Sequence, residues 1–198
     1  MRDEGKMKDT IDIMEELFNE IYQYFKEKEK YVQLFADYDT KKEEWFQGEM
    51  IKLFHGLKER GVKILFSGKS CIQKGLSEEI RNLGKALGKK YRKPDFILEL
   101  NGKQKILEVK AFSIQGQRKL EEYLKLNSSL KSDFEETMKS PIKEYLLIFA
   151  HSNDNIVVWE ESSEKLIKET DNRLKQIKKK NINEKFIISL WTNQLKEF

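Results

Sequence analysis

Two acidic residues and a lysine stand out because the local sequence predicts that their side chains meet. Asp95 precedes one strand-forming run, and Glu108 and Lys110 belong to a second run that follows Asn101-Gly102. Two such runs joined by Asn-Gly are typical of a β-hairpin with a two-residue turn. In that register Asp95 lies directly opposite Glu108, with Cβ atoms about 4.5–5.5 Å apart. Lys110 shares their face because side chains alternate along a strand.

This trio has a charge imbalance that a metal ion could relieve. Opposed carboxylates repel each other unless a proton or a cation compensates them, and Lys110 supplies one positive charge for two negative ones. A divalent ion between Asp95 and Glu108 would restore the balance, with the Val109 carbonyl oxygen as a further ligand. An all-oxygen ligand set favours Mg²⁺ or Mn²⁺ over zinc. The plainer alternative is a surface hairpin with a salt bridge.

The spacing of these residues resembles the signature of the PD-(D/E)XK nuclease superfamily. Pro94-Asp95 is followed, after twelve residues, by Glu108-Val109-Lys110. An acid-x-Lys triplet also begins at Glu4 and at Asp39, but only the triplet at Glu108 follows a Pro-Asp pair and lies in an apolar strand. The resemblance covers residues 43–150 and includes the core order of the family: a helix, three strands, a helix and a strand.

The resemblance implies phosphodiester hydrolysis with in-line attack that leaves a 5′-phosphate. It makes Asp95 and Glu108 metal ligands, and Lys110 the group that orients or helps to deprotonate the attacking water. The cofactor is then Mg²⁺ or Mn²⁺, which lowers the pKa of a bound water and neutralises the leaving oxygen. Positioning and electrostatics would supply most of the catalysis.

Members of this family often add an acid from the helix before the hairpin. Glu49 is the best candidate, because it borders the apolar stripe of a helix expected at 43–60. Three other acids fit that face less well: Glu43, Glu44 and Glu59. A glutamine after the lysine recurs in some members, which makes Gln115 and Gln117 candidate site residues. An ordinary solvated helix acid remains the alternative for Glu49.

A basic run leads directly into Asp95 and is a candidate contact for nucleic-acid phosphates. Its members are Lys89, Lys90, Arg92 and Lys93, with Lys69 and Lys74 nearby in sequence. Contacts of this kind give affinity and salt dependence without sequence preference. A solvated loop is the alternative interpretation of the run.

Composition limits the classes of protein that fit. Of the 198 residues 36% are charged, yet the formal net charge is only +4, which allows nucleic-acid binding without requiring it. One cysteine and two histidines exclude a disulfide framework, a zinc cluster and a four-thiolate iron–sulfur cluster. No apolar run approaches the ~20 residues that span a bilayer. A cytoplasmic protein without membrane contact is therefore expected.

The periodicity of the chain predicts an α/β fold that would position the trio. Helices are expected at about 10–35, 43–60, 78–87, 118–130 and 163–180, and strands at about 62–66, 96–100, 103–110, 145–150, 155–159 and 186–191. We expect a restriction-endonuclease-like mixed central sheet flanked by helices at 43–198. Residues 1–42 form an N-terminal helical extension that packs on the core or on a partner subunit.

The function expected from these features is that of a metal-dependent DNA endonuclease, restriction-type or structure-selective, acting on double-stranded DNA. The alternatives are a non-catalytic nucleic-acid-binding module that retains the nuclease fold, and a structural protein with incidental carboxylates. Homodimerisation through the N-terminal helices is a further expectation, because in this family cutting two strands usually takes two sites.

Overall fold

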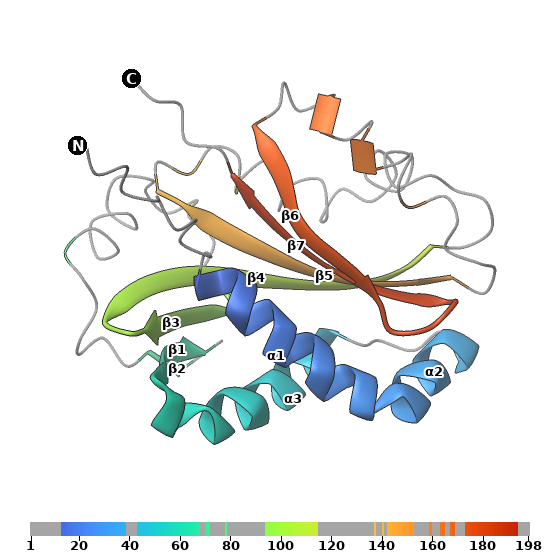
Figure 1. The fold of residues 1–198 in the computed structure, drawn as a ribbon, viewed down its shortest axis with the longest axis horizontal. Coiled ribbons are helices and arrows are strands. Elements are labelled where there is room, and N and C mark those ends of the chain that lie inside the picture. The colour runs from blue at the N-terminus through green and yellow to red at the C-terminus, as the bar shows by residue number, and fades with distance from the viewer. Residues whose placement is uncertain are drawn as a thin grey trace, which may run out of the picture.

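Helices and strands are mixed along the chain, as the computed structural model in Figure 1 shows. The structure describes residues 13–38, 43–67, 70–71, 94–114, 142–152 and 173–193, and positions 78, 137, 140, 159, 163–164 and 167–168. The helices in these parts are α1 (Ile13–Glu27), α2 (Glu29–Tyr38), α3 (Glu43–Gly56) and the 3₁₀ helix η1 (Lys58–Arg60). The strands are β1 (Val62–Ser67), β2 (Ser70–Cys71), β3 (Phe96–Leu100), β4 (Lys103–Ile114), β5 (Glu144–Ser152), β6 (Leu174–Asn181) and β7 (Phe186–Asn193).

The seven described strands form one sheet in the order β2-β1-β3-β4-β5-β7-β6. β4 and β5 are parallel, and the other neighbouring strands are antiparallel. Parallel neighbours need a crossover connection, so the chain must return to the same end of the sheet between Ile114 and Glu144. The expected α/β class and the mixed central sheet are therefore confirmed.

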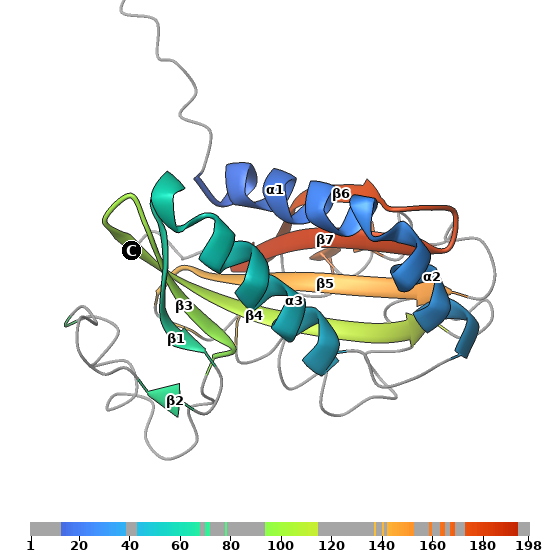
Figure 2. The ribbon, with the colours of Figure 1, turned by 90° about the horizontal axis from the view of Figure 1, so that it is seen from below.

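Helices α1, α2 and α3 pack on one face of this sheet (Figure 2). α1 lies against β6 and β7, and α3 lies against β1 and β4. Alternate residues of the central strands point toward the helices, and Val109, Leu147 and Ile188 are fully buried there. At the centre the Phe46 ring of α3 stacks on the Phe149 ring of β5, with centroids 4.1 Å apart. This core fixes α3 relative to the strands that carry the candidate site.

The helix expected at 10–35 is two helices, with a break at Lys28. The apolar stripe of α1 is buried and consists of Met14, Leu17, Phe18, Ile21 and Phe25. At the break the Phe25 carbonyl accepts the N–H of Lys28, and the Lys28 carbonyl accepts the N–H of Val32. The change of direction lets α2 bury Val32 in the same core.

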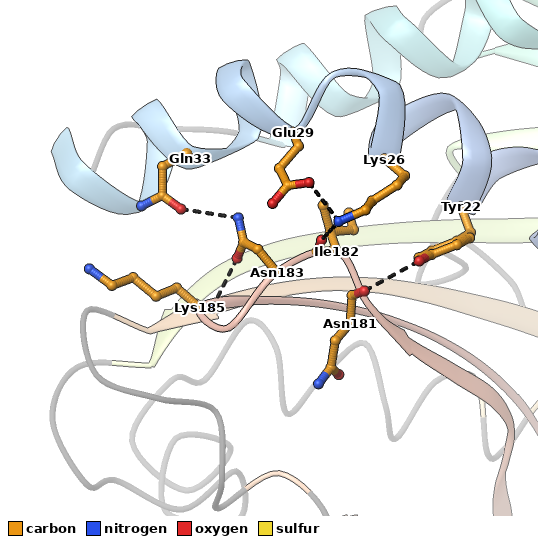
Figure 3. A network of polar contacts seen from close by, with 8 residues as sticks. All are labelled: Tyr22, Lys26, Glu29, Gln33, Asn181, Ile182, Asn183 and Lys185. Carbon is orange, nitrogen blue, oxygen red and sulfur yellow. Dashed lines mark hydrogen bonds and ion pairs between the residues drawn. The ribbon is translucent and has the colours of Figure 1, made fainter.

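Side chains of α1 and α2 hold the turn between β6 and β7 (Figure 3). The Lys26 ammonium donates to the carbonyl oxygen of Ile182 and pairs with Glu29 at 2.6 Å. Asn183 in the turn donates through Nδ2 to Gln33 at 3.0 Å. The first two helices are thus tied to the last two strands by polar contacts as well as by the core.

The helix expected at 163–180 is wrong over its second half, because Leu174–Asn181 is the edge strand β6. Pairing with β7 and packing against α1 override the helical preference of this lysine-rich stretch. Lys178 pairs with Glu15 of α1 at 2.9 Å, and the Lys180 ammonium lies 4.5 Å from the Tyr22 ring centroid. Lysines on an edge strand also discourage pairing with other chains.

Of the strand expected at 155–159 the structure describes only Trp159. Both edges of β5 are occupied over Tyr145–His151, by β4 and by β7. Trp159 is helical and buried, with its ring 6.5 Å from that of Trp191. Of the helix expected at 78–87 only Glu78 is described, and it is helical; the helix expected at 118–130 lies outside the described residues.

Among the described helices none combines the length and the apolarity that a membrane crossing requires.

Candidate active site

The β3–β4 hairpin has the predicted turn and the predicted register. Asn101 and Gly102 both have positive φ angles, 48° and 77°, as a two-residue type I′ turn requires. The ladder pairs Leu100 with Lys103 at the turn and ends where Phe96 pairs with Leu107. The residue before Phe96 is Asp95, and the residue after Leu107 is Glu108, so the two acids meet at the open end of the hairpin.

The carboxylates of Asp95 and Glu108 replace the main-chain bonds of the ladder at this point. The Val109 N–H donates to Oδ2 of Asp95 at 2.8 Å, and the Asp95 N–H donates to Oε2 of Glu108 at 3.2 Å. Backbone N–H groups must find acceptors when they are buried, and here each acid accepts from the other strand. This reciprocal clasp fixes both carboxylates where β3 stops.

Lys110 lies between two acids on the part of β4 that extends past β3. Its Nζ is 3.1 Å from Oε1 of Glu108 and 3.2 Å from Oε1 of Glu43, the first residue of α3. Glu108 and Lys110 are 7% and 8% exposed. A buried ion pair needs good geometry to offset desolvation, and here one ammonium bridges two carboxylates.

The residues described around this point carry more negative than positive charge. Asp95, Glu108 and Glu43 supply three carboxylates, and Lys110 is the cation that bridges two of them. Carboxylates that crowd together destabilise one another unless a further cation compensates them. The arrangement therefore resembles a cation site more than a balanced salt bridge.

Glu49 lies elsewhere on α3 and has its own partners. It is 7% exposed, and it accepts hydrogen bonds from Tyr24 at 2.7 Å and from Lys52 at 2.6 Å, with Lys28 at 3.3 Å. Burial alone would raise the pKa of the Glu49 carboxyl, but the hydrogen bonds from Lys52, Tyr24 and Lys28 outweigh it and lower the pKa to about 2. Burial and the bond to Glu49 raise the pKa of Tyr24 to about 12.

Glu43 fits the apolar stripe of the helix less well than Glu49, and yet it is Glu43 that contacts Lys110. The apolar stripe identifies which face of the helix is buried, but it does not say which end of the helix lies near Asp95. The connection does: α3 leads through η1 into Val62, which pairs with Leu100 at the turn end of the hairpin. The N-terminus of α3 must then lie toward the open end, where Asp95 is.

The remaining residues of the expected site divide into two groups. Val109 is buried in β4 and donates its N–H to Asp95. The basic run and the glutamines lie outside the described residues: Lys89, Lys90, Arg92, Lys93, Gln115 and Gln117, together with Lys69 and Lys74.

The oxygen donors fit a hard divalent cation that is bound partly by its substrate. In the part of the chain that the structure describes, no three His, Cys, Asp or Glu side chains form a group that could hold a metal ion by themselves. Mg²⁺ does not need such a cage, because it commonly uses one or two carboxylates, waters and substrate phosphates. Asp95 and Glu108 would supply the carboxylates.

Comparison with known proteins adds no relative: no family model matches the chain, and neither the curated proteins nor the solved structures contain a significant match.

Proposed function

We propose that the chain is a metal-dependent phosphodiesterase that cuts DNA as an endonuclease. The observation that carries the proposal is the convergence of Asp95, Glu108 and Lys110 at the open end of the β3–β4 hairpin. Two acids on opposed strands with an ammonium on the same ribbon are what the PD-(D/E)XK resemblance requires of a catalytic site. The excess of carboxylates over ammonium groups among the described residues of the site supports a role for a divalent cation.

The order of the elements supports a restriction-endonuclease-like fold. In the core order of a helix, three strands, a helix and a strand, the first helix and the four strands correspond to α3, β1, β3, β4 and β5, with the short strand β2 as an addition. The second helix of that core belongs between β4 and β5, in residues that the structure does not describe. The parallel pairing of β4 and β5 requires a crossover connection there.

In this proposal each residue has a distinct task. Asp95 and Glu108 would hold a Mg²⁺ ion, and their backbone clasp keeps both carboxylates in place. A bound ion would supply Lewis-acid activation of the phosphate and of a water molecule. Lys110 would orient the attacking water or stabilise the negative charge of the phosphate, and Glu43 positions the ammonium of Lys110.

The substrate in this proposal is double-stranded DNA. The basic run that precedes Asp95 would contact phosphates on either side of the bond that is cut. A homodimer would bring two such sites to the two strands.

Incubation of supercoiled plasmid with the purified chain tests the proposal, with Mg²⁺ or with EDTA. We expect nicking in Mg²⁺, none in EDTA, and a loss of about 10³-fold in Asp95→Ala and Lys110→Ala. Lys63→Ala is the matched control, because Lys63 also pairs with a strand carboxylate, Glu99, but is 63% exposed and lies on β1. The control should cut like the unmodified chain.

Two other results would contradict catalysis. DNA binding without nicking, in both Mg²⁺ and Mn²⁺, would indicate the non-catalytic nucleic-acid-binding module instead. Neither binding nor nicking would indicate a structural role for the hairpin acids.

A further inference from the structure

We infer that Lys110 is an internal counter-ion that competes with a divalent cation for Glu108, and that Glu43 retains the ammonium when Glu108 releases it. The inference rests on the proposed function, because it concerns the acids of the same site. It adds a step that the resemblance does not contain, namely an exchange of partners by Lys110 when the cation binds.

The contacts of Glu108 make this exchange necessary. Its Oε2 accepts the N–H of Asp95 at 3.2 Å, and its Oε1 lies 3.1 Å from Nζ of Lys110. Both oxygens of the carboxylate therefore already have partners. A cation that approaches Glu108 meets the positive charge of Lys110 at contact distance, and like charges in a buried site repel strongly.

The position of Glu43 allows the ammonium of Lys110 to keep an ion pair during the exchange. Lys110 is 8% exposed, and a buried ammonium that loses a carboxylate without keeping another one pays a large desolvation cost. Nζ of Lys110 is already 3.2 Å from Oε1 of Glu43, so one ion pair remains when Glu108 turns to the cation. The clasp between the backbone N–H groups and the two acids is untouched by this movement.

The exchange also makes the availability of the Lys110 ammonium for a phosphate depend on cation binding. While Lys110 neutralises Glu108, its ammonium is occupied by two carboxylates and is a weaker partner for a phosphate. When Glu108 releases it, one of its donors becomes available. The lysine would then serve the substrate mainly in molecules that have bound the cation.

Titration of the DNA-free chain with Mn²⁺, followed by the electron paramagnetic resonance signal of the free ion, tests this exchange without measuring cleavage. Lys110→Met removes the competing charge and keeps most of the side-chain volume, so we expect it to bind Mn²⁺ at least about fivefold more tightly. Lys63→Met, at the exposed pair with Glu99, should change the affinity by less than about twofold.

A second pair of variants keeps the test decisive if Lys110→Met does not fold. Glu43→Gln removes the alternative partner of Lys110, so the ammonium stays on Glu108 and Mn²⁺ should bind about threefold or more weakly. Glu44→Gln makes the same charge change on the neighbouring exposed residue of α3 and should have little effect. In a Lys110→Met background Glu43→Gln should lose most of its effect, because Glu43 acts through the lysine.

The outcomes separate this inference from the proposed function. If the unmodified chain binds Mn²⁺ and Lys110→Met binds it equally or more weakly, the exchange is wrong and the metal site stands. If Glu43→Gln weakens binding equally with and without Lys110, Glu43 is itself a ligand and the exchange is again wrong. If neither the unmodified chain nor any variant binds Mn²⁺ without DNA, the exchange is wrong; if none binds it with a DNA duplex present either, the proposed function fails as well.

Discussion

Helix α3 carries two acids that meet lysines, the buried Glu49 and the partly exposed Glu43, and their surroundings differ in charge. Near its middle, Glu49 is one carboxylate with two ammonium groups and a tyrosine hydroxyl around it. At its first residue, Glu43 joins Glu108 around the ammonium of Lys110, and Asp95 adds a third carboxylate beside Glu108. Counted over the residues that the structure describes, the first group has more positive than negative charge, and the second has the reverse.

The difference indicates what each group is suited to do. A carboxylate with a surplus of donors is fully satisfied and stabilises the packing of its helix. Carboxylates that outnumber the cations described among them have an affinity for an added cation. Burial is the same for Glu49 and Glu108, so the balance of charge, rather than burial, distinguishes the candidate site from the structural cluster.

The largest expected effect is on the rate of plasmid nicking, when glutamate is replaced by glutamine in one cluster or in the other. Glu108→Gln should lower the rate of plasmid nicking by about 10³-fold, because it removes a proposed metal ligand. Glu49→Gln should leave the rate of the folded chain within about threefold of the original, since its partners lie on α1, on α3 and at the break before α2. Single-turnover cleavage rates measure both. Equal losses in the two variants would contradict the distinction.

In contrast to the cleavage rate, the free energy of unfolding should depend strongly on Glu49. Glu49→Gln should lower the free energy of unfolding by about 3 kcal/mol at pH 7, because it removes a carboxylate whose pKa falls from 4.5 to about 2 on folding. A group with a lowered pKa stabilises the fold above its unfolded pKa, and this contribution disappears as the pH falls from 4.5 toward 2. Urea unfolding at pH 7 and pH 2.5 measures it.

The control for that experiment is the pH dependence itself. In Glu49→Gln the stability lost between pH 4.5 and pH 2 should be smaller than in the unmodified chain by most of the same amount. An unchanged pH dependence would show that Glu49 is not the satisfied carboxylate that the comparison requires.

Sequence reasoning could predict the hairpin because all of its determinants are local. Asn101-Gly102 selects the turn, the turn selects the register, and the register brings Asp95 to Glu108. The choice of Glu49 over Glu43 could not be made in the same way. A stripe of apolar residues reports the buried face of α3 but not which of its ends lies beside the open end of the hairpin.

The prediction of a helix across residues 174–180 was wrong for a related reason. Lysine favours helices in isolation, and the residues that make β6 a strand are its distant neighbours. Pairing with β7 supplies its main-chain bonds, and Glu15 and Tyr22 of α1 receive its lysines. Such contacts join residues at opposite ends of the chain and leave no periodic signal within the stretch.

A smaller effect is expected at the turn end of the hairpin, where a substitution tests whether the strand register positions the site. Gly61 has φ of 86°, and a Cβ there would collide with Oδ1 of Asn101. Gly61→Ala should therefore lower the free energy of unfolding by about 1–2 kcal/mol. Thermal unfolding measures this cost. The cleavage rate of the folded variant should be retained if the ladder keeps Asp95 opposite Glu108, and a lost rate at full folding would contradict that.

The smallest effect is expected at an ion pair that is neither deeply buried nor unbalanced. Lys178 and Glu15 pair at 2.9 Å between β6 and α1, and both are partly exposed. Lys178→Ala should cost less than about 1 kcal/mol in urea unfolding at 0.15 M salt. A cost as large as that of Glu49→Gln would mean that burial and charge balance do not rank these clusters as we describe.

The proposed cation site at Asp95 and Glu108 is tested most directly by the number of Mn²⁺ ions bound per chain. The proteins to compare are the unmodified chain, Glu108→Gln and Glu49→Gln. The excess of carboxylates at Asp95, Glu108 and Glu43 predicts about one ion in the unmodified chain and in Glu49→Gln, and none in Glu108→Gln at the same concentration. The same stoichiometry in all three proteins, or loss of the ion in Glu49→Gln alone, would show that these carboxylates do not form a cation site.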